Sequence, residues 1–281
     1  MIRIILLTLC IQLLMQSSFA QKDNCENIPA CCKCESVGAQ IPSSICKRIH
    51  EDAVRTCYGS KPNSWLDFYR SPDASVGAKK PLVIWAHANR SCADNNTPKR
   101  LWSNSQWDIN LKDEDVHLLS WSSVNDVLTK DQLREAEEDF KLVLQWVKEN
   151  AEALHVNLDS VYVAGQSRGS WVSWKYANLS GKNDDGIKIQ GCYMVQAFPK
   201  KKGWPIDARD YVTDHSPPLL MIYKNDYDVD DMHSPLNGKE VADKYNDYEM
   251  NNVRLKRNVS GDNGDYYKDL IPFLRGKIDF D

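Results

Sequence analysis

Segments of strand length alternate with amphipathic segments of helical length over most of this chain, and this alternation limits the folds open to it. Strands are expected at residues 65–69, 81–86, 116–121, 160–164, 187–195, 219–223 and 253–259. Helices are expected at residues 130–154, 168–179, 239–248 and 266–274. Strands joined through helices need right-handed crossovers, which make the strands parallel and cover both sheet faces. The sequence therefore predicts an α/β protein with a mainly parallel sheet and helices on both faces.

The first twenty residues have the pattern of a secretory signal peptide. Arg3 precedes an apolar run at residues 4–15, and the small residues Ser18 and Ala20 stand where a signal peptidase cleaves. A membrane-spanning helix needs about 20 apolar residues, and neither this run nor any later one reaches that length. We therefore expect residues 1–20 to be removed and the mature protein to be secreted, extracellular and without a membrane span.

The cysteines are concentrated near the start of the mature chain. Of nine cysteines in the sequence, Cys10 lies in the signal peptide and six of the others fall between residues 25 and 57. A segment this short buries little apolar surface, so its stability depends on disulfide bonds. These bonds form in the oxidising compartments through which secreted proteins pass. The eight disulfide candidates are Cys25, Cys31, Cys32, Cys34, Cys46, Cys57, Cys92 and Cys192. Their pairing cannot be derived from spacing alone.

This distribution predicts three parts: a signal peptide at 1–20, a disulfide-rich N-terminal segment at 21–60, and an α/β domain at 61–281. Zinc binding is the alternative for the cluster at Cys31, Cys32 and Cys34, but its spacing differs from that of known zinc ligand pairs. We expect no metal and no cofactor. Glycosylation is expected for a secreted chain, with Asn-x-Ser/Thr sites at Asn89, Asn95, Asn178 and Asn258.

Charge composition argues against nucleic acid as a partner. The sequence has 35 basic and 39 acidic residues, a net charge of −4, so it lacks the basic surplus that binds phosphate backbones.

Residues 165–169 form the most informative motif of the chain. They read Gly-Gln-Ser-Arg-Gly and lie between a predicted strand and a predicted helix. This context is typical of a nucleophile elbow, a strained turn that presents a serine hydroxyl at a helix N-terminus. Glycines on both sides let the strand and the helix approach closely. An ordinary strand-to-helix turn is the alternative, because the bare pattern is common.

Residues 65–275 resemble the α/β-hydrolase superfamily, specifically its small secreted esterase-like members. The resemblance rests on the elbow, on residues 87–89 (His-Ala-Asn) where many members carry His-Gly-Gly, and on residues 219–226, which match the strand that ends in the triad acid. It implies that Ser167 is the nucleophile and Asp226 the acid. It also implies an oxyanion hole formed by backbone N–H groups of Arg168 and of Ala88 or Asn89.

One member of the expected triad is missing from its usual place. The general-base histidine of the superfamily follows the last strand, and Asn263 stands there in this chain. An amide cannot accept the serine proton, so the loss would lower activity by several orders of magnitude. His233, just after the acidic loop, is the candidate substitute, against the alternative of a solvated loop histidine. His87 is expected to pack within its own loop.

Two functions from different classes follow. The first is a serine hydrolase acting on a small ester or acyl substrate through Ser167 and Asp226. The second is an inactive pseudoenzyme that uses the fold and the disulfide-rich segment to bind a protein or glycan partner. Asn263 favours the second, and so does the glycosylation site at Asn89, because a glycan there would cover the site.

Overall fold

The protein was analysed as a computed structural model of the 281-residue chain. The structure describes residues 35–36, 39–40, 53–61, 63–72, 78–88, 93, 96–103, 109–123, 129–183, 186–197, 207–226, 233–259 and 265–280. The expected signal peptide and most of the expected disulfide-rich segment lie outside these residues. Two short antiparallel strands, β1 (Glu35–Ser36) and β2 (Ala39–Gln40), are described from that segment.

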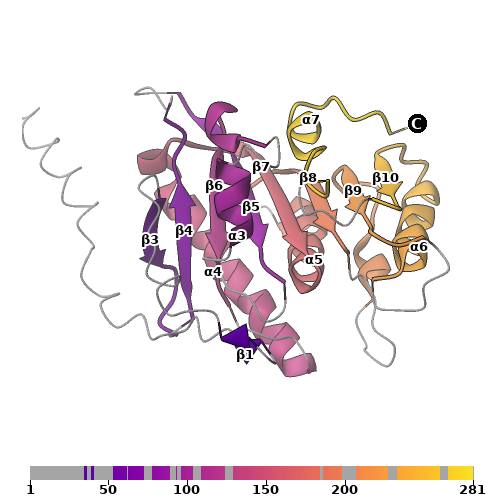
Figure 1. The fold of residues 1–281 in the computed structure, drawn as a ribbon, viewed down its shortest axis with the longest axis horizontal. Helices are drawn as coiled ribbons and strands as arrows, with labels where there is room; N and C mark the ends of the chain where they lie inside the picture. Colours follow the sequence, from indigo (N-terminus) through magenta and orange to yellow (C-terminus); the bar gives the residue numbers. More distant parts are fainter. Residues whose placement is uncertain are drawn as a thin grey trace, which may run out of the picture.

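An eight-stranded sheet forms the centre of the molecule (Figure 1). Its strands are β3 (Ala53–Cys57), β4 (Trp65–Tyr69), β5 (Lys80–Ala86), β6 (His117–Trp121), β7 (Val156–Gln166), β8 (Ile189–Val195), β9 (Leu219–Ile222) and β10 (Val253–Lys256). They are ordered β10-β9-β8-β7-β5-β6-β4-β3. Only β4 runs against the others, since it pairs antiparallel with both of its neighbours. The predicted mainly parallel sheet is therefore confirmed.

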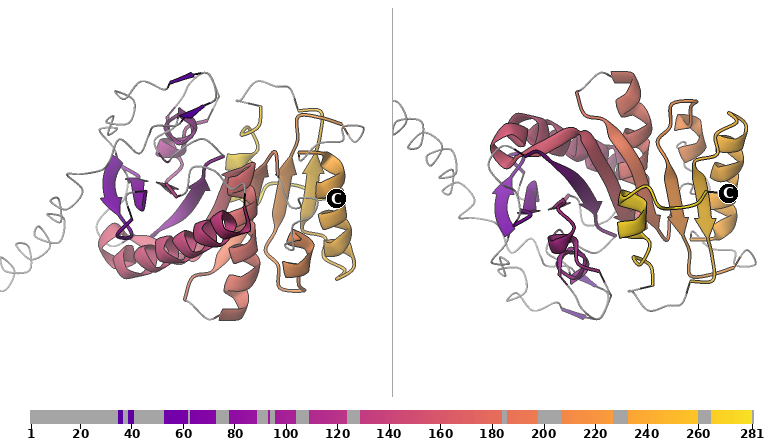
Figure 2. Two further views of the ribbon diagram at one scale, coloured as in Figure 1. Left: turned by 90° about the horizontal axis from the view of Figure 1, so that it is seen from below. Right: turned by 90° about the horizontal axis from the view of Figure 1, so that it is seen from above.

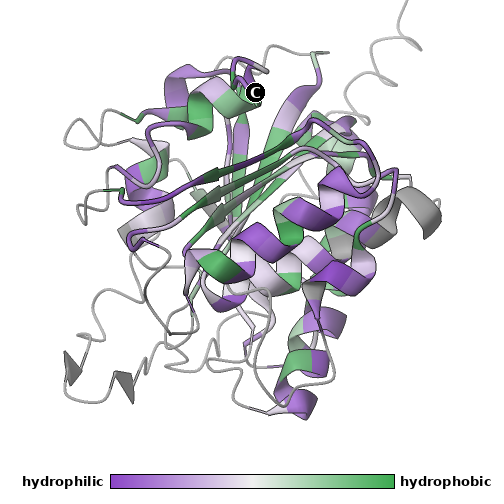
Figure 3. Cartoon of the chain, turned by 90° about the vertical axis from the view of Figure 1, so that its right-hand side faces the viewer, coloured by the Kyte–Doolittle hydropathy of each residue, from purple (hydrophilic) through white to green (hydrophobic). Residues whose placement is uncertain are grey.

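Helices cover both faces of the sheet (Figure 2). Three helices pack on one face, where Phe140, Val172 and Val241 join one buried cluster; they are α4 (Lys130–Leu154), α5 (Arg168–Asn183) and α6 (Pro235–Asn246). On the other face, Trp102 and Phe273 join a second cluster; they belong to α3 (Asn96–Trp102) and α7 (Leu270–Leu274). The strands are hydrophobic while the outer helix surfaces are hydrophilic (Figure 3).

Capping residues explain helix boundaries that the apolar pattern does not predict correctly. The helix expected from residue 239 begins earlier, at Pro235, because Ser234 caps it by accepting the Leu236 N–H at 3.3 Å and proline suits the first turn. The α4 boundaries match the expectation, and Thr129 forms a capping box with Gln132 there. The closing helix is shorter than expected, since residues 265–269 form turns.

The α/β domain begins before the predicted boundary at residue 61. Strand β3 pairs with β4 along its whole length, so residues 53–57 belong to the main sheet. Arg55 reaches across to Asp67 with two contacts of 2.7 Å, and both side chains are buried. The sequence did not predict β3 as part of the sheet, because Cys57 led us to include these residues in the disulfide-rich segment. Among the described residues, no helix has the length and apolarity to cross a membrane.

Candidate active site

Ser167 lies on a strained turn between β7 and α5, as the elbow pattern predicts. Its φ angle is 53°, in the left-handed region that a non-glycine residue occupies at a cost of roughly 1–3 kcal/mol. The surrounding structure holds it there: its N–H donates to the Val195 carbonyl at 3.0 Å, and its carbonyl accepts the Ser170 N–H at 3.1 Å. The turn leaves the residue partly exposed at the carboxyl ends of the parallel strands, where α/β proteins bind ligands.

The two glycines that flank the elbow have no room for a side chain. A Cβ atom on Gly165 would lie 2.5 Å from the Gly169 carbonyl carbon. A Cβ atom on Gly169 would lie 2.2 Å from the Ala86 carbonyl oxygen and 2.7 Å from that of His87. The start of α5 is therefore packed directly against the end of β5, which brings the residues after β5 next to Ser167.

His233 supplies the imidazole that the sequence places in doubt. Its Nε2 atom lies 2.8 Å from the Ser167 hydroxyl oxygen, although the two residues are 66 positions apart. This distance is within the range for direct proton transfer between a nucleophile and a general base. Asn263, at the usual base position, lies outside the described residues. The structure thus brings Ser167 together with the substitute histidine.

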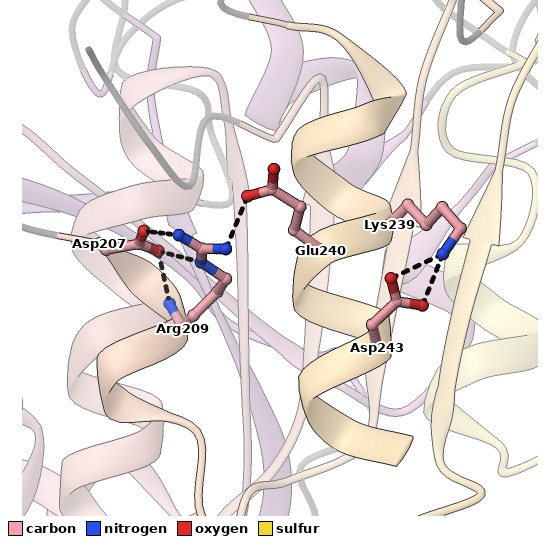
Figure 4. Close-up of polar contacts among 5 residues, drawn as sticks. All are labelled: Asp207, Arg209, Lys239, Glu240 and Asp243. Carbon is pink, nitrogen blue, oxygen red and sulfur yellow. Dashed lines mark hydrogen bonds and ion pairs between the residues drawn. The ribbon is translucent and has the colours of Figure 1, made fainter. Parts of the chain in front are cut away.

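The position of His233 is set by the helix that follows it. Ser234 caps α6, so the backbone at residue 233 is held next to a defined helix start. The helix itself is tied to the neighbouring 3-10 helix at Ala208–Tyr211, where Arg209 contacts Asp207 and, at 2.9 Å, Glu240 (Figure 4). Lys239 and Asp243 form a further pair along α6 at 2.6 Å. These ion pairs are partly or fully exposed and individually weak.

Asp226, the proposed triad acid, follows β9 and is partly exposed. Its carboxylate accepts hydrogen bonds from Arg257 and, at 3.1 Å, from the Asn258 side chain. Both partners lie just after β10, and no sequence motif marks either of them. Arg257 offsets part of the charge that an acid would use to stabilise an imidazolium, because a nearby cation competes for the same carboxylate.

His87 and Arg168 form a buried pair beneath the elbow. Both are almost fully buried, and an Arg168 guanidinium nitrogen lies 3.0 Å from His87 Nε2. His87 Nδ1 lies 2.7 Å from the Ala88 carbonyl oxygen. Burial, followed by the Arg168 charge, holds the pKa of His87 well below its usual value. His87 therefore packs within its loop, as expected, while the buried arginine side chain was not anticipated.

The structure contradicts the expectation at two of the candidate modification sites. Asn178 is buried in α5 and its side-chain nitrogen donates to the Trp174 carbonyl at 2.9 Å, so a glycan on that nitrogen is incompatible with the fold. Cys192 is a free thiol, fully buried in β8, which corrects its assignment as a disulfide partner. Asn258 is exposed and stays a candidate. Other candidates lie outside the described residues or side chains: Cys25, Cys31, Cys32, Cys34, Cys46, Cys57, Asn89, Cys92 and Asn95.

No metal site is found among the described residues, where no group of three or more histidine, cysteine or acidic side chains is arranged to hold an ion. The chemistry visible in this part of the chain is that of a serine hydroxyl, an imidazole, and backbone N–H groups at a helix start. Such groups perform acyl transfer without a bound cofactor.

Comparison with known proteins identifies the fold. No protein-family model matches the chain, and no curated protein sequence matches it. Solved structures do: a lipase/esterase from Lactobacillus plantarum has a TM-score of 0.61 at 12% identity, over 81% of this chain and 99% of its own. A carbohydrate esterase from gut microbiota has a TM-score of 0.59 at 14% identity, over 82% of this chain and 99% of its own.

A third similar structure is esterase 2 of Thermogutta terrifontis, phosphorylated by paraoxon. Its TM-score is 0.56 at 11% identity, and the match covers 82% of this chain and 99% of that protein. Together with the strand order, these similarities show that the chain has the α/β-hydrolase fold found in esterases and carboxylesterases.

Proposed function

We propose that this protein is a serine hydrolase of carboxylic esters, with Ser167 as the nucleophile and His233 as its general base. The observation that carries the proposal is the 2.8 Å distance between the Ser167 hydroxyl and His233 Nε2, at an elbow strained into the left-handed region. A serine held in that conformation beside an imidazole is the pairing that acyl transfer requires. The esterases among the similar structures support the same reaction class.

The reaction proceeds in two halves. Ser167 Oγ attacks the ester carbonyl carbon while His233 Nε2 accepts the hydroxyl proton, giving a tetrahedral oxyanion. Collapse of this intermediate breaks the bond to the alcohol, which leaves with the proton from His233. Water then attacks the acyl-enzyme while His233 accepts its proton, giving a second tetrahedral intermediate. When this intermediate collapses, the bond to Ser167 Oγ breaks, His233 returns the proton to Oγ, and the carboxylic acid is released. The backbone N–H of Arg168, at the start of α5, is proposed to bind the oxyanion together with that of Ala88 or Asn89.

Asp226 is proposed as the acid that supports His233, at the position matched by the superfamily. Its pairing with Arg257 would weaken that support, so the catalytic unit is expected to depend more on Ser167 and His233 than on the carboxylate. The remaining proposals come from the sequence: removal of residues 1–20, secretion, a disulfide-rich segment at 21–60, and glycosylation, for which Asn258 remains accessible.

The decisive experiment compares histidine variants of the purified mature protein. Wild type should react with a fluorophosphonate probe and hydrolyse p-nitrophenyl acetate. Ser167→Ala should abolish both, and His233→Ala should lower kcat/KM by about 10³-fold or more because the hydroxyl loses its base. His215→Ala is the matched control, since His215 is a largely exposed histidine beside Asp214.

Absence of labelling and turnover in a folded wild-type protein would refute the hydrolase and favour the pseudoenzyme. Equal losses in His233→Ala and His215→Ala would mean that His233 is not the base. Asn263→His adds a further comparison: with His233 serving Ser167, it should bring no gain.

A further inference from the structure

The Arg168 side chain is an unusual occupant of a nucleophile elbow. It is 1% exposed, and a guanidinium keeps its charge at any working pH, so its burial is costly unless acceptors surround it. An oxyanion donor needs only the backbone N–H of residue 168, which any side chain except that of proline would leave in place. The buried arginine must therefore be explained by what its side chain contacts.

One contact of the guanidinium is with the loop on the other side of the site. A terminal nitrogen of Arg168 lies 3.0 Å from Nε2 of His87, a fully buried residue directly after β5. Arginine can only donate, so His87 Nε2 must accept and carry no proton. The other ring nitrogen, Nδ1, then holds the proton and donates it to the Ala88 carbonyl at 2.7 Å. The two neighbours thus select one neutral tautomer.

This chain of two hydrogen bonds connects the two proposed sources of oxyanion donors. It begins at Arg168, next to the nucleophile, and ends at the peptide group of Ala88. The same two segments also meet through the backbone, because Gly169 is packed against the carbonyl groups of Ala86 and His87. The backbone contact sets the distance between α5 and β5, while the side-chain contacts tie His87 and the Ala88 carbonyl to the start of α5.

We propose that Arg168, acting through His87, is a positioning residue that holds the Ala88 peptide group in the orientation needed for the oxyanion hole. The proposal rests on the proposed ester hydrolysis and assigns this arginine a role in transition-state stabilisation, separate from its backbone N–H. Because His87 cannot take up a proton without losing the Arg168 bond, the pair also keeps the imidazole neutral. The low pKa of His87 agrees with this.

Kinetics of Arg168→Met give the first test, with p-nitrophenyl acetate as substrate. We expect kcat to fall roughly tenfold to hundredfold while KM changes less than about twofold, since the loss concerns the transition state and not substrate binding. Affinity for a trifluoromethyl ketone, which forms an oxyanion on the enzyme, should fall in the same proportion as kcat/KM. Lys175→Met is the matched control, because it removes a partly buried cation from the same helix. Lys175 lies two turns beyond the elbow and pairs with Glu137 at a distance of 2.7 Å.

Variants of His87 test the same two hydrogen bonds without changing Arg168. They also provide a test if Arg168→Met fails to fold. His87→Gln keeps an acceptor for Arg168 and a donor for Ala88, whereas His87→Leu keeps neither. We expect Gln to retain clearly more kcat and ketone affinity than Leu. Equal values for the two, or wild-type kcat in folded Arg168→Met, would overturn the positioning role.

A spectroscopic measurement separates this proposal from the proposed function. In ¹⁵N-histidine NMR spectra of the wild type, His87 should stay in the neutral Nδ1–H form from pH 5 to 8, and in Arg168→Met its Nε2 signal should shift. An inactive wild type that shows this tautomer would refute ester hydrolysis but leave the contact in place. Activity with a titrating His87 would refute the contact instead.

Discussion

His117 shows at the scale of one residue how burial changes the chemistry of a side chain. It opens β6, is fully buried, and accepts the Ser71 N–H at Nδ1 over 3.0 Å. Phe68 packs against its ring with centroids 5.2 Å apart. Burial lowers the pKa of His117 from 6.5 to about 4, so the ring stays neutral in the folded protein at pH values where an exposed histidine takes up a proton.

The pH dependence of stability should carry the signature of this residue. The folded-state pKa is below the unfolded value, so the stability linked to neutral His117 is complete above pH 6.5 and is lost as pH falls toward 4. His117→Asn keeps an acceptor for Ser71 but cannot titrate. Between pH 7 and 4.5 its free energy of unfolding should therefore fall by about 2 kcal/mol less than that of wild type.

Urea denaturation at the two pH values measures this difference. His215→Asn, at an exposed position, should follow wild type. An identical pH dependence in His117→Asn and wild type would show that His117 does not titrate in this range.

Helix α6 connects element structure to the candidate site. Ser234 is both the N-cap of this helix and the residue that follows the proposed base. Capping by serine contributes about 1 kcal/mol, and its loss frays the first helical turn. Fraying at this end would loosen the backbone next to His233, so we expect the cap to affect the distance between His233 and Ser167.

Two cap substitutions distinguish stability from positioning. Ser234→Ala and Thr129→Ala should each lower the free energy of unfolding by about 1 kcal/mol, because each removes an N-cap side chain. Only Ser234→Ala should slow fluorophosphonate labelling, by severalfold. Thr129 caps the helix after β6, and three strands separate β6 from β9, after which His233 follows. Chemical denaturation and labelling rates measure both effects. Equal labelling rates in the two variants would show that the cap of α6 does not affect the position of His233.

The whole molecule depends on an edge strand that the apolar pattern does not mark. Strand β3 supplies Arg55, which neutralises the buried Asp67 carboxylate and stacks on Trp65 at 4.3 Å. The adjoining Tyr58 hydroxyl donates to the Ser122 carbonyl, so the region just before residue 61 reaches into the core. Removing it would leave a buried charge uncompensated and expose the edge of β4, a site for aggregation.

Truncation at the boundary expected from sequence should therefore fail. A chain that begins at residue 61 is expected to be insoluble or to melt far below a chain that begins at residue 21. In the longer chain, Arg55→Leu should lower the free energy of unfolding by about 3–5 kcal/mol, because it removes the cation paired with the buried Asp67 carboxylate. Thermal unfolding measures both. A truncated protein with the stability of the mature chain would show that β3 is dispensable.

Local chemistry accounts for the parts of this protein that could be predicted from sequence. The strand and helix pattern predicts the parallel sheet because burial of both sheet faces requires apolar strands. The elbow could be located because Gly165, Ser167 and Gly169 satisfy steric requirements within five residues. The bounds of α4 followed from the periodicity of its apolar residues. These features depend on neighbours in the chain, so they can be read from it.

The pairings that define the site were decided by the tertiary structure. His233 meets Ser167 across 66 positions, and Arg168 meets His87 across 81, through loops with no regular pattern. Strand β3 likewise follows from its partner β4 and not from its own composition. Sequence could therefore state which groups the chemistry needs and that a base was absent from its usual place. Only the fold brings a candidate base from another loop, because strands far apart in sequence end at the same edge of the sheet.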